Sequence, residues 1–353
     1  YTIYQDYDTK QIMCTPGTHF ICDNLGAFTK EPCEQVGLAW ANTNSTCYAD
    51  EEARCKGLYD DDMWNGDFCG YTNTNGQTLN EGMECISSSS DKCQNSIIND
   101  GGKCETIAGW RGCKYSTINA GGVCEANTTD SCIFSTINAD GKCIGNESGG
   151  CNHSTVNTGG ICEGIANNTC KWLTLNGGSC EGDNGSICKE VTINEGGICK
   201  GMGYEGCYRP TINDGGTCEG YESIACGYAT VNNGGVCDGK FARACQGSVI
   251  NSGGVCIAAQ VDLDQQNNGA CNGVKINSGG ICKGQGKNGC RYASVYEGGE
   301  CWAETDGTCS SSSYSGTGAT SGCCRGQYCP STAPRCECAN HEKMDSSGNC
   351  ITA

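Results

Sequence analysis

Cysteine is the residue type with the widest chemistry in this chain, because its sulfur can bind metal, attack a substrate or form a disulfide. The chain has 36 Cys and only 3 His among 353 residues. Zinc sites favour C-x2-C pairs that a second pair or histidines complete. Most cysteines here are instead separated by seven or ten residues, as at Cys113, Cys124 and Cys132. We therefore expect disulfides, no metal site and no cofactor.

The number of cysteines also indicates a compartment. Disulfides at this density persist in oxidising environments, so we expect a secreted protein that is extracellular or held at the cell surface. Tyr1 in place of Met would suit a mature chain without its signal peptide. No stretch is long and apolar enough to span a membrane. The net charge of −18 disfavours a nucleic-acid partner.

Catalytic motifs are absent from the sequence. We find no G-x-S-x-G, H-E-x-x-H, P-loop or dinucleotide-binding glycine pattern. Acidic residues are plentiful, which leaves a glycosidase-like carboxylate pair open. We predict no catalytic residues and a protein that is not an enzyme.

The cysteines between Cys85 and Cys309 follow a repeat. Spacings of C-x7-C and C-x10-C alternate with a period of 19 residues, and the region holds twelve such units. A fixed period near 20 is typical of stacked repeats. Each long spacer alternates polar and apolar residues, as at Thr117 and Ile118, and then reads Asn-x-Gly-Gly. This pattern predicts a short strand followed by a tight turn.

We therefore predict an all-β, disulfide-rich fold in which 19-residue coils stack as a β-solenoid. Twelve coils would give a rod of roughly 55–60 Å. The alternative is a string of small, independent, EGF-like disulfide-bonded beads. Those modules use six cysteines with a C-x-C element, which the repeat lacks.

Disulfide connectivity cannot be read from sequence alone. We favour closure of the C-x7-C pairs, because a closed loop would tolerate the longer spacing from Cys256 to Cys271. Closure of the C-x10-C pairs, such as Cys113 with Cys124, stays open. The favoured scheme pairs the following candidates in order: Cys124, Cys132, Cys143, Cys151, Cys162, Cys170, Cys180, Cys188, Cys199 and Cys207.

The regions on either side of the repeats differ from them. Residues 1–84 are expected to form an irregular cysteine-rich region with a free arm at residues 1–11. Residues 310–322 read as a Ser/Gly linker, and residues 323–353 as a small six-cysteine module. We predict that the arm adds as a strand to a neighbouring subunit, through its β-forming residues Tyr1, Ile3, Tyr4 and Tyr7.

Two surface features recur along the repeats. Six sequons for N-glycosylation occur, at Asn44, Asn127, Asn146, Asn152, Asn167 and Asn184. Several lie in successive seven-residue loops, which predicts a ridge of glycans along the rod. A column of Thr residues beside the apolar positions predicts either hydrogen-bonded ladders or an ice-binding face.

Residues 85–309 resemble the tandem cysteine-rich repeats of protist extracellular proteins, such as ciliate surface antigens and the subunits of mastigonemes. The resemblance lies in the regular cysteine period, the Gly/Thr/Asn-rich spacers and the sequons. It implies a structural role at the cell exterior and transfers no functional residue. We predict a glycosylated structural subunit that self-associates head to tail into a filament or coat. The alternative is a secreted binding protein, either a lectin-like adhesin acting through residues 323–353 or an ice-binding solenoid.

Overall fold

The computed structural model describes residues 69–335, except 183–184, 242, 259–268, 286–287, 304–307, 317–321 and 327–328. Outside this range it describes β1 (Ile3–Gln5), β2 (Ile12–Cys14), β3 (Ala39–Ala41), β4 (Thr46–Tyr48), β32 (Lys343–Met344) and β33 (Cys350–Ile351). Everything described is strand, turn or loop. No helix that could cross a membrane occurs among these residues.

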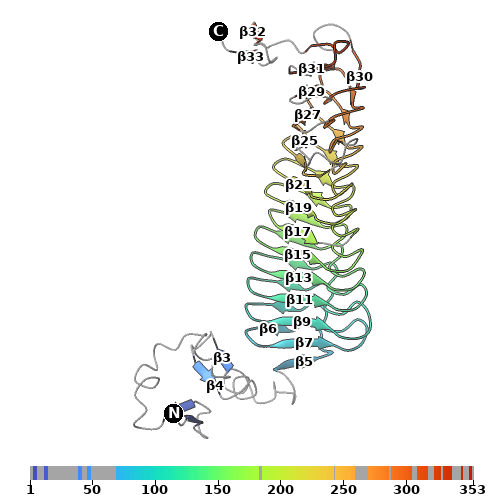
Figure 1. Cartoon of the computed structure of the whole chain (residues 1–353). Helices are drawn as coiled ribbons and strands as arrows, with labels where there is room; N and C mark the ends of the chain where they lie inside the picture. The colour runs from blue at the N-terminus through green and yellow to red at the C-terminus, as the bar shows by residue number, and fades with distance from the viewer. Residues whose placement is uncertain are drawn as a thin grey trace.

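Residues 70–325 form two long parallel sheets that share the same coils (Figure 1). The 14-stranded sheet contains β5 (Gly70–Thr72), β7 (Glu84–Ser87), β9 (Lys103–Thr106), β11 (Val123–Ala126), β13 (Lys142–Gly145), β15 (Ile161–Gly164), β17 (Ser179–Gly182), β19 (Ile198–Gly201), β21 (Thr217–Gly220), β23 (Val236–Gly239), β25 (Val255–Ala258), β27 (Ile281–Gly284), β29 (Glu300–Ala303) and β31 (Cys323–Arg325). The 13-stranded sheet contains β6 (Thr78–Leu79), β8 (Ile97–Ile98), β10 (Thr117–Ile118), β12 (Thr136–Ile137), β14 (Thr155–Asn157), β16 (Thr174–Asn176), β18 (Thr192–Ile193), β20 (Thr211–Ile212), β22 (Thr230–Val231), β24 (Val249–Ile250), β26 (Lys275–Ile276), β28 (Ser294–Val295) and β30 (Ser313–Tyr314).

Each strand pairs with the equivalent strand of the next coil. Cys124 in β11 lies opposite Cys104 on one side and Cys143 on the other. Ile118 in β10 pairs in the same way with Ile98 and Ile137. The predicted β-solenoid is confirmed, and the alternative of independent beads is wrong, since beads would not share a sheet.

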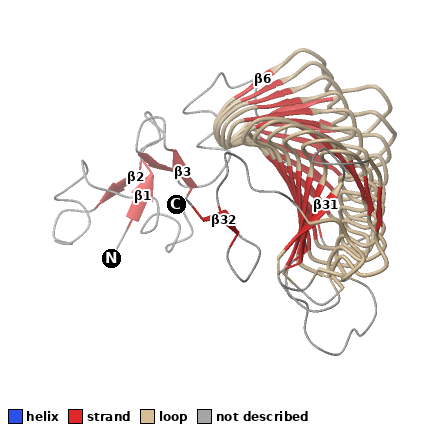
Figure 2. Ribbon diagram, turned by 90° about the horizontal axis from the view of Figure 1, so that it is seen from above, coloured by secondary structure: helices blue, strands red, loops and turns tan. Residues whose placement is uncertain are grey.

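The coils superimpose when viewed along the stack (Figure 2), and the interior contains two columns of equivalent residues. One is the strand cysteine of each coil, and the other is the apolar residue of each short strand, such as Ile193 and Ile212. Both columns are fully buried. A single 19-residue coil cannot enclose either of them, so the apolar burial that stabilises the fold arises only when coils stack.

The Asn-x-Gly-Gly turn needs its two glycines for different reasons. The first adopts a left-handed conformation, with φ of 70° at Gly196, which glycine adopts without steric cost. The second packs against the preceding coil, where a β-carbon on Gly216 would lie only 2.6 Å from the carbonyl oxygen of Ile193. The turn asparagines of neighbouring coils form ladders, in which Nδ2 of Asn119 donates to Oδ1 of Asn99 at 2.9 Å.

The stack extends beyond the predicted bounds of 85–309. At its N-terminal end, β5 and β6 add strands before Cys85. At its C-terminal end, Tyr314 pairs with Val295 and Cys324 pairs with Cys301. These strands correct the predicted linker at 310–322 and the separate module starting at residue 323. The physical reason is that an exposed strand edge offers hydrogen bonds to any following segment with an inward residue at the right position.

The predicted free arm is also corrected where the structure describes it. Ile3 and Tyr4 belong to β1, which pairs antiparallel with β2, so that Ile3 lies opposite Cys14. The segment therefore already has a partner strand within its own chain. Tyr1 and Tyr7, the other two residues of the predicted arm, lie outside the described residues.

Candidate functional site

Each seven-residue loop is closed by a disulfide. The structure joins Cys124–Cys132, Cys143–Cys151, Cys162–Cys170, Cys180–Cys188 and Cys199–Cys207. This is the connectivity that the sequence favoured over the C-x10-C scheme. Sulfurs of neighbouring coils gather in groups of three, but no free cysteine occurs among the described residues. A disulfide offers no thiolate for a metal or a nucleophilic attack.

The predicted glycosylation sites differ in accessibility. Asn167 is exposed on its loop, whereas Asn152 is buried, with 7% exposure, and its Oδ1 accepts a hydrogen bond from the Lys171 amide at 2.7 Å. Asn127 and Asn146 are half-buried neighbours on successive coils, and Nδ2 of Asn146 donates to Oδ1 of Asn127. Asn44 and Asn184 lie outside the described residues. The described sites therefore do not form an even ridge.

We expect unequal glycan occupancy in the native protein. Asn167 should be occupied and Asn152 unoccupied, because a glycan on Asn152 would displace a buried side chain and break its hydrogen bond to the Lys171 amide. Asn127 and Asn146 should not both be modified in one molecule, since their amides touch. Cleavage restricted to arginine keeps all four sites in one fragment, and mass spectrometry of that fragment measures occupancy. A fragment with glycans on both Asn127 and Asn146 would refute this expectation.

A regular threonine column lies on the outer face of the 13-stranded sheet. Threonines of seven successive coils pair in register, from Thr117 to Thr230. The column ends where Val249 pairs with Thr230 and Lys275 pairs with Val249. In the part of the stack that the structure describes, the asparagine ladder forms side-chain hydrogen bonds from coil to coil, as from Nδ2 of Asn138 to Oδ1 of Asn119.

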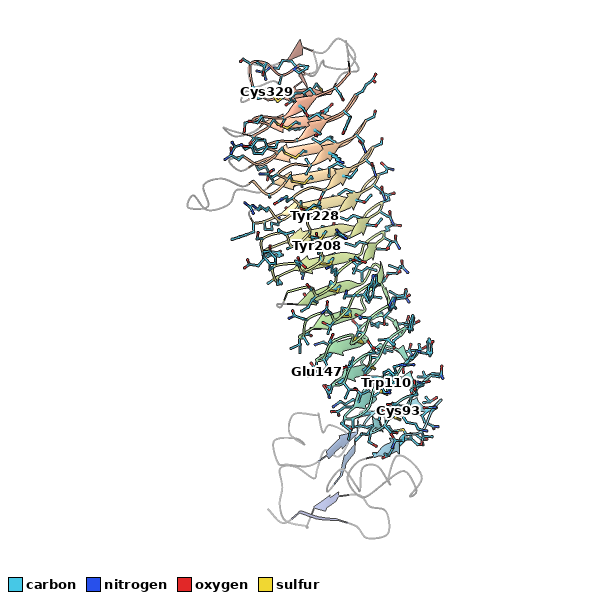
Figure 3. The ribbon with its side chains drawn as sticks, turned by 90° about the vertical axis from the view of Figure 1, so that its right-hand side faces the viewer. Cys93, Trp110, Glu147, Tyr208, Tyr228 and Cys329 are labelled. Atoms are coloured by element: carbon cyan, nitrogen blue, oxygen red, sulfur yellow. A yellow bond between two sulfur atoms is a disulfide. The ribbon has the colours of Figure 1, made fainter. Side chains whose placement is uncertain are left out.

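Four rings stack along one corner of the rod, a feature that the sequence analysis missed. Tyr115, Phe134, His153 and Trp172 occupy equivalent positions, with centroids 5.5, 4.9 and 4.7 Å apart in order. Further along the same corner, Tyr208 and Tyr228 meet edge to face at 5.4 Å (Figure 3). The signal in the sequence is an aromatic residue two positions after the second cysteine of four successive loops. We call the four stacked rings the aromatic ladder.

The aromatic ladder stabilises the corner and leaves little ring face for a ligand. Its residues adopt left-handed conformations, with φ of 56° at Phe134 and 54° at Trp172, which are unfavourable for bulky side chains. Stacked pairs contribute about 0.5–1.5 kcal/mol each and can offset that cost. The inner rings cover one another, and Lys171 Nζ lies 4.3 Å from the Trp172 centroid.

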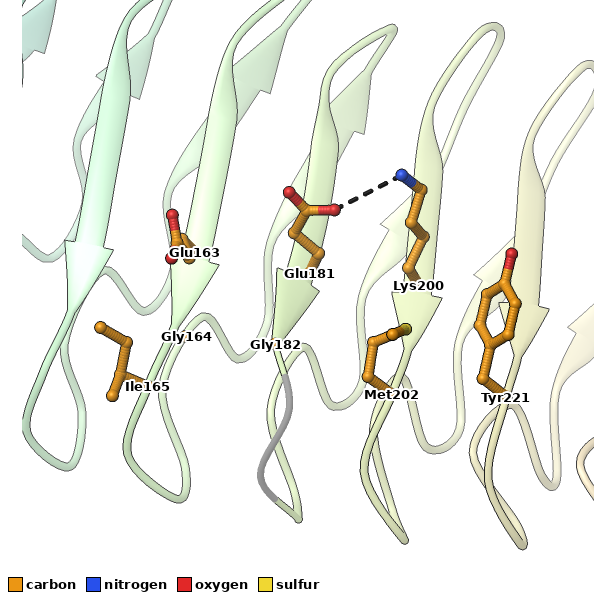
Figure 4. Close-up of a pocket in the computed structure, with 8 residues that line it drawn as sticks. All are labelled: Glu163, Gly164, Ile165, Glu181, Gly182, Lys200, Met202 and Tyr221. Carbon is orange, nitrogen blue, oxygen red and sulfur yellow. Dashed lines mark hydrogen bonds and ion pairs between the residues drawn. The ribbon is translucent and has the colours of Figure 1, made fainter.

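A hollow of about 550 Å³ lies along the outside of the 14-stranded sheet, over β15, β17, β19 and β21 (Figure 4). In each strand the residue after the cysteine points outward and the next points inward. The outward residues Glu163, Glu181 and Lys200 form a charged side of the hollow. Residues two positions further on form the opposite side, and these are Ile165, Met202 and Tyr221. Gly164 and Gly182 lie between the two sides.

The two sides of the hollow differ in chemistry. Glu181 forms an ion pair with Lys200 at 3.4 Å, and Glu163 forms one with Lys142. On the other side, Ile165 is 49% exposed and Met202 is 42% exposed. The Tyr221 hydroxyl donates to Glu219 at 2.8 Å. This hydrogen bond, with partial burial and nearby carboxylates, raises the pKa of Tyr221.

Comparisons with known proteins find similarity among solved structures alone. No protein-family model and no curated protein matches the chain. Among solved structures, the chain is similar to a TibC-catalyzed hyper-glycosylated fragment of TibA, with 22% identity and a TM-score of 0.42. The alignment covers 68% of this chain and 88% of that one. A similarity of this size carries no inference about function.

Proposed function

We propose that the chain is a structural subunit of an extracellular, glycosylated fibre or coat, and that its role is not catalytic. The observation that carries this proposal is the uninterrupted stack, in which two sheets of 13 and 14 strands run through the same coils. Each coil is held by the disulfide of its own loop as well as by its contacts with the neighbouring coils. Such a body is long, stiff and resistant to local opening, which suits a mechanical role.

The extracellular location rests on the disulfides. Every loop of the stack from Cys85–Cys93 to Cys301–Cys309 is closed by a disulfide. Glutathione and thioredoxin in the cytosol keep such thiols reduced, whereas secreted and surface proteins retain their bridges. The sequons agree with passage through a glycosylating secretory route.

Head-to-tail assembly would use the terminal strands of the stack. Among the described residues, β5 and β31 end the 14-stranded sheet at its opposite poles. The outer edge of a terminal strand offers backbone groups that can pair with another chain. At β31 the Cys324 amide already donates to the Pro334 carbonyl at 2.8 Å, so residues 334–335 would have to move aside for this pairing. Pairing β31 of one copy with β5 of the next would continue the sheet and place equivalent faces in line. A contact between different surfaces of this kind propagates into a filament unless it closes a ring.

We expect Thr72→Pro to block this assembly without unfolding the rod. The Asn73 amide donates to Ile86 of β7, so the Thr72 amide points to the open edge of β5. Proline removes that donor, whereas Thr72→Ala keeps it and serves as the control. Electron microscopy and sedimentation of concentrated native-like protein should show filaments or lattices for Thr72→Ala and dispersed rods for Thr72→Pro. Dispersed rods for all proteins would count against the structural role.

A second candidate function is that of a secreted binding protein. The observation that favours it is the hollow over β15 to β21, which joins charged and apolar groups along four coils. The hollow offers a binding surface on the repeats, distinct from both sequence predictions, namely a lectin-like module at residues 323–353 and an ice-binding threonine face.

A further inference from the structure

The outer surface of the rod is nearly periodic, and the hollow is a local departure from that period. The outward residue at the position of Ile165 differs from coil to coil. It is Asn146 in the coil before the hollow, and Ile165, Met202 and Tyr221 within the hollow. The inward glycines between its two sides have an internal reason to be glycine. A β-carbon on Gly164 would meet Ile187 at 2.3 Å, and one on Gly182 would meet the Gly164 carbonyl at 2.5 Å. Because these positions point inward, no side chain rises between the two rows, and the surface there is backbone.

We infer that this hollow binds an uncharged oligosaccharide that lies along the rod. Its volume of about 550 Å³ is within the range of small-molecule sites. Four coils extend over roughly 14 Å at the usual spacing between strands, which accommodates a short chain of sugar units. Sugar binding does not depend on filament formation, since the hollow lies over β15 to β21, between the terminal strands β5 and β31.

The chemistry of the two sides matches the two faces of a pyranose ring. The carboxylates of Glu163 and Glu181 can accept hydrogen bonds from sugar hydroxyls, and the Lys200 ammonium can donate to them. The exposed side chains of Ile165, Met202 and Tyr221 can pack on the C–H face of the ring. An amphiphilic ligand with hydroxyls on one side and C–H groups on the other satisfies both rows.

Charge selects an uncharged sugar over an anionic one. Two carboxylates and one ammonium line the hollow, and Glu219 lies beside it as the acceptor for Tyr221. The whole chain carries a net charge of −18. A sulfated or uronic-acid polymer would bring further negative charge to this surface and would be repelled.

The test is a binding screen on the intact chain with uncharged oligosaccharides. Trimers to hexamers of glucose, galactose, mannose and N-acetylglucosamine would be screened, and the best would be measured by calorimetry at up to about 10 mM. Glu181→Gln and Tyr221→Ala should each weaken binding by about tenfold, because one removes a charged acceptor and the other a packing surface. Circular dichroism checks that both variants fold.

Matched controls come from the same two columns outside the hollow. Glu125 forms an ion pair with Lys103 at 3.0 Å, as Glu181 does with Lys200, so Glu125→Gln should leave binding unchanged. Ile107 is 54% exposed at the position equivalent to Ile165, and Ile107→Ala should also have no effect. Equal loss in controls and test variants would overturn the assignment, as would the absence of binding by any uncharged sugar.

The sugar could come from another molecule or from the chain itself. Asn167 is an exposed sequon two residues after Ile165, so its glycan could fold back into the hollow. Binding would therefore be measured for the glycosylated protein and for Asn167→Gln. Equal affinity identifies an external glycan as the ligand, and tighter binding by Asn167→Gln identifies competition from the chain's own glycan. Both results support a sugar site, whereas binding of only anionic sugars would refute it.

Discussion

Replacing Gly216 by Ala is expected to destabilise the central coils by about 3 kcal/mol. Gly216 has no left-handed conformation to lose, so the cost is steric. The added β-carbon would lie 2.6 Å from the Ile193 carbonyl oxygen, and that oxygen already accepts the Asn213 amide at 2.8 Å. Relieving the clash requires the two coils to separate, which breaks hydrogen bonds between them.

Gly273→Ala separates this steric effect from the ordinary cost of replacing a glycine. Gly273 has φ of 67° and no atom within 4 Å of an added β-carbon, and Tyr228 and Tyr292 adopt similar angles at equivalent positions. We expect a cost of about 1 kcal/mol there. Hydrogen exchange should report faster opening of residues 190–240 in Gly216→Ala than of any region in Gly273→Ala. Similar exchange in the two variants would show that coils can shift apart freely.

The difference between these two glycines shows what a sequence can and cannot predict here. The turn, its glycines and the inward position of Ile118 follow from the alternation within one repeat, and Ile118 is fully buried. The reason for the second glycine does not follow from one repeat, because the atom that an added β-carbon would strike belongs to another coil. A period identifies equivalent positions, whereas contacts between coils depend on the register of the stack.

The surfaces were less predictable than the core for a related reason. The aromatic ladder could have been found by aligning the residue two positions after each loop cysteine, since Phe134 and His153 are 19 residues apart. The hollow could not have been found in this way, because it combines side chains of two outward columns over four coils. The burial of Asn152 could not be predicted either, because it depends on a hydrogen bond from the Lys171 amide on the next coil.

The C-terminal end of the stack was also hard to predict. Ser313 lies in a Ser-rich stretch that resembles a linker, yet the preceding strand pairs with it.

Full reduction of the disulfides is expected to have the largest effect, namely loss of the folded rod at denaturant concentrations that the oxidised protein withstands. The interior has few large side chains, and cysteines form one of its two columns. Removing one native disulfide typically costs 2–5 kcal/mol. The second cysteine of most loops is also left-handed, with φ of 52° at Cys132 and 53° at Cys207. Without the bond, these cysteines can relax to ordinary angles and shift the following strand out of register.

Guanidinium titrations followed by circular dichroism would measure this, with the reduced protein kept under anaerobic reductant and left unalkylated. Thiols remain small and apolar, so the core keeps its volume and the comparison isolates the covalent links. Re-oxidation of the reduced sample should restore the original midpoint and controls for irreversible damage. If the reduced and oxidised midpoints coincide, the parallel ladders and the apolar column, including Ile193 and Ile212, are sufficient to hold the stack. The bridges would then protect the loops against proteolysis without stabilising the fold.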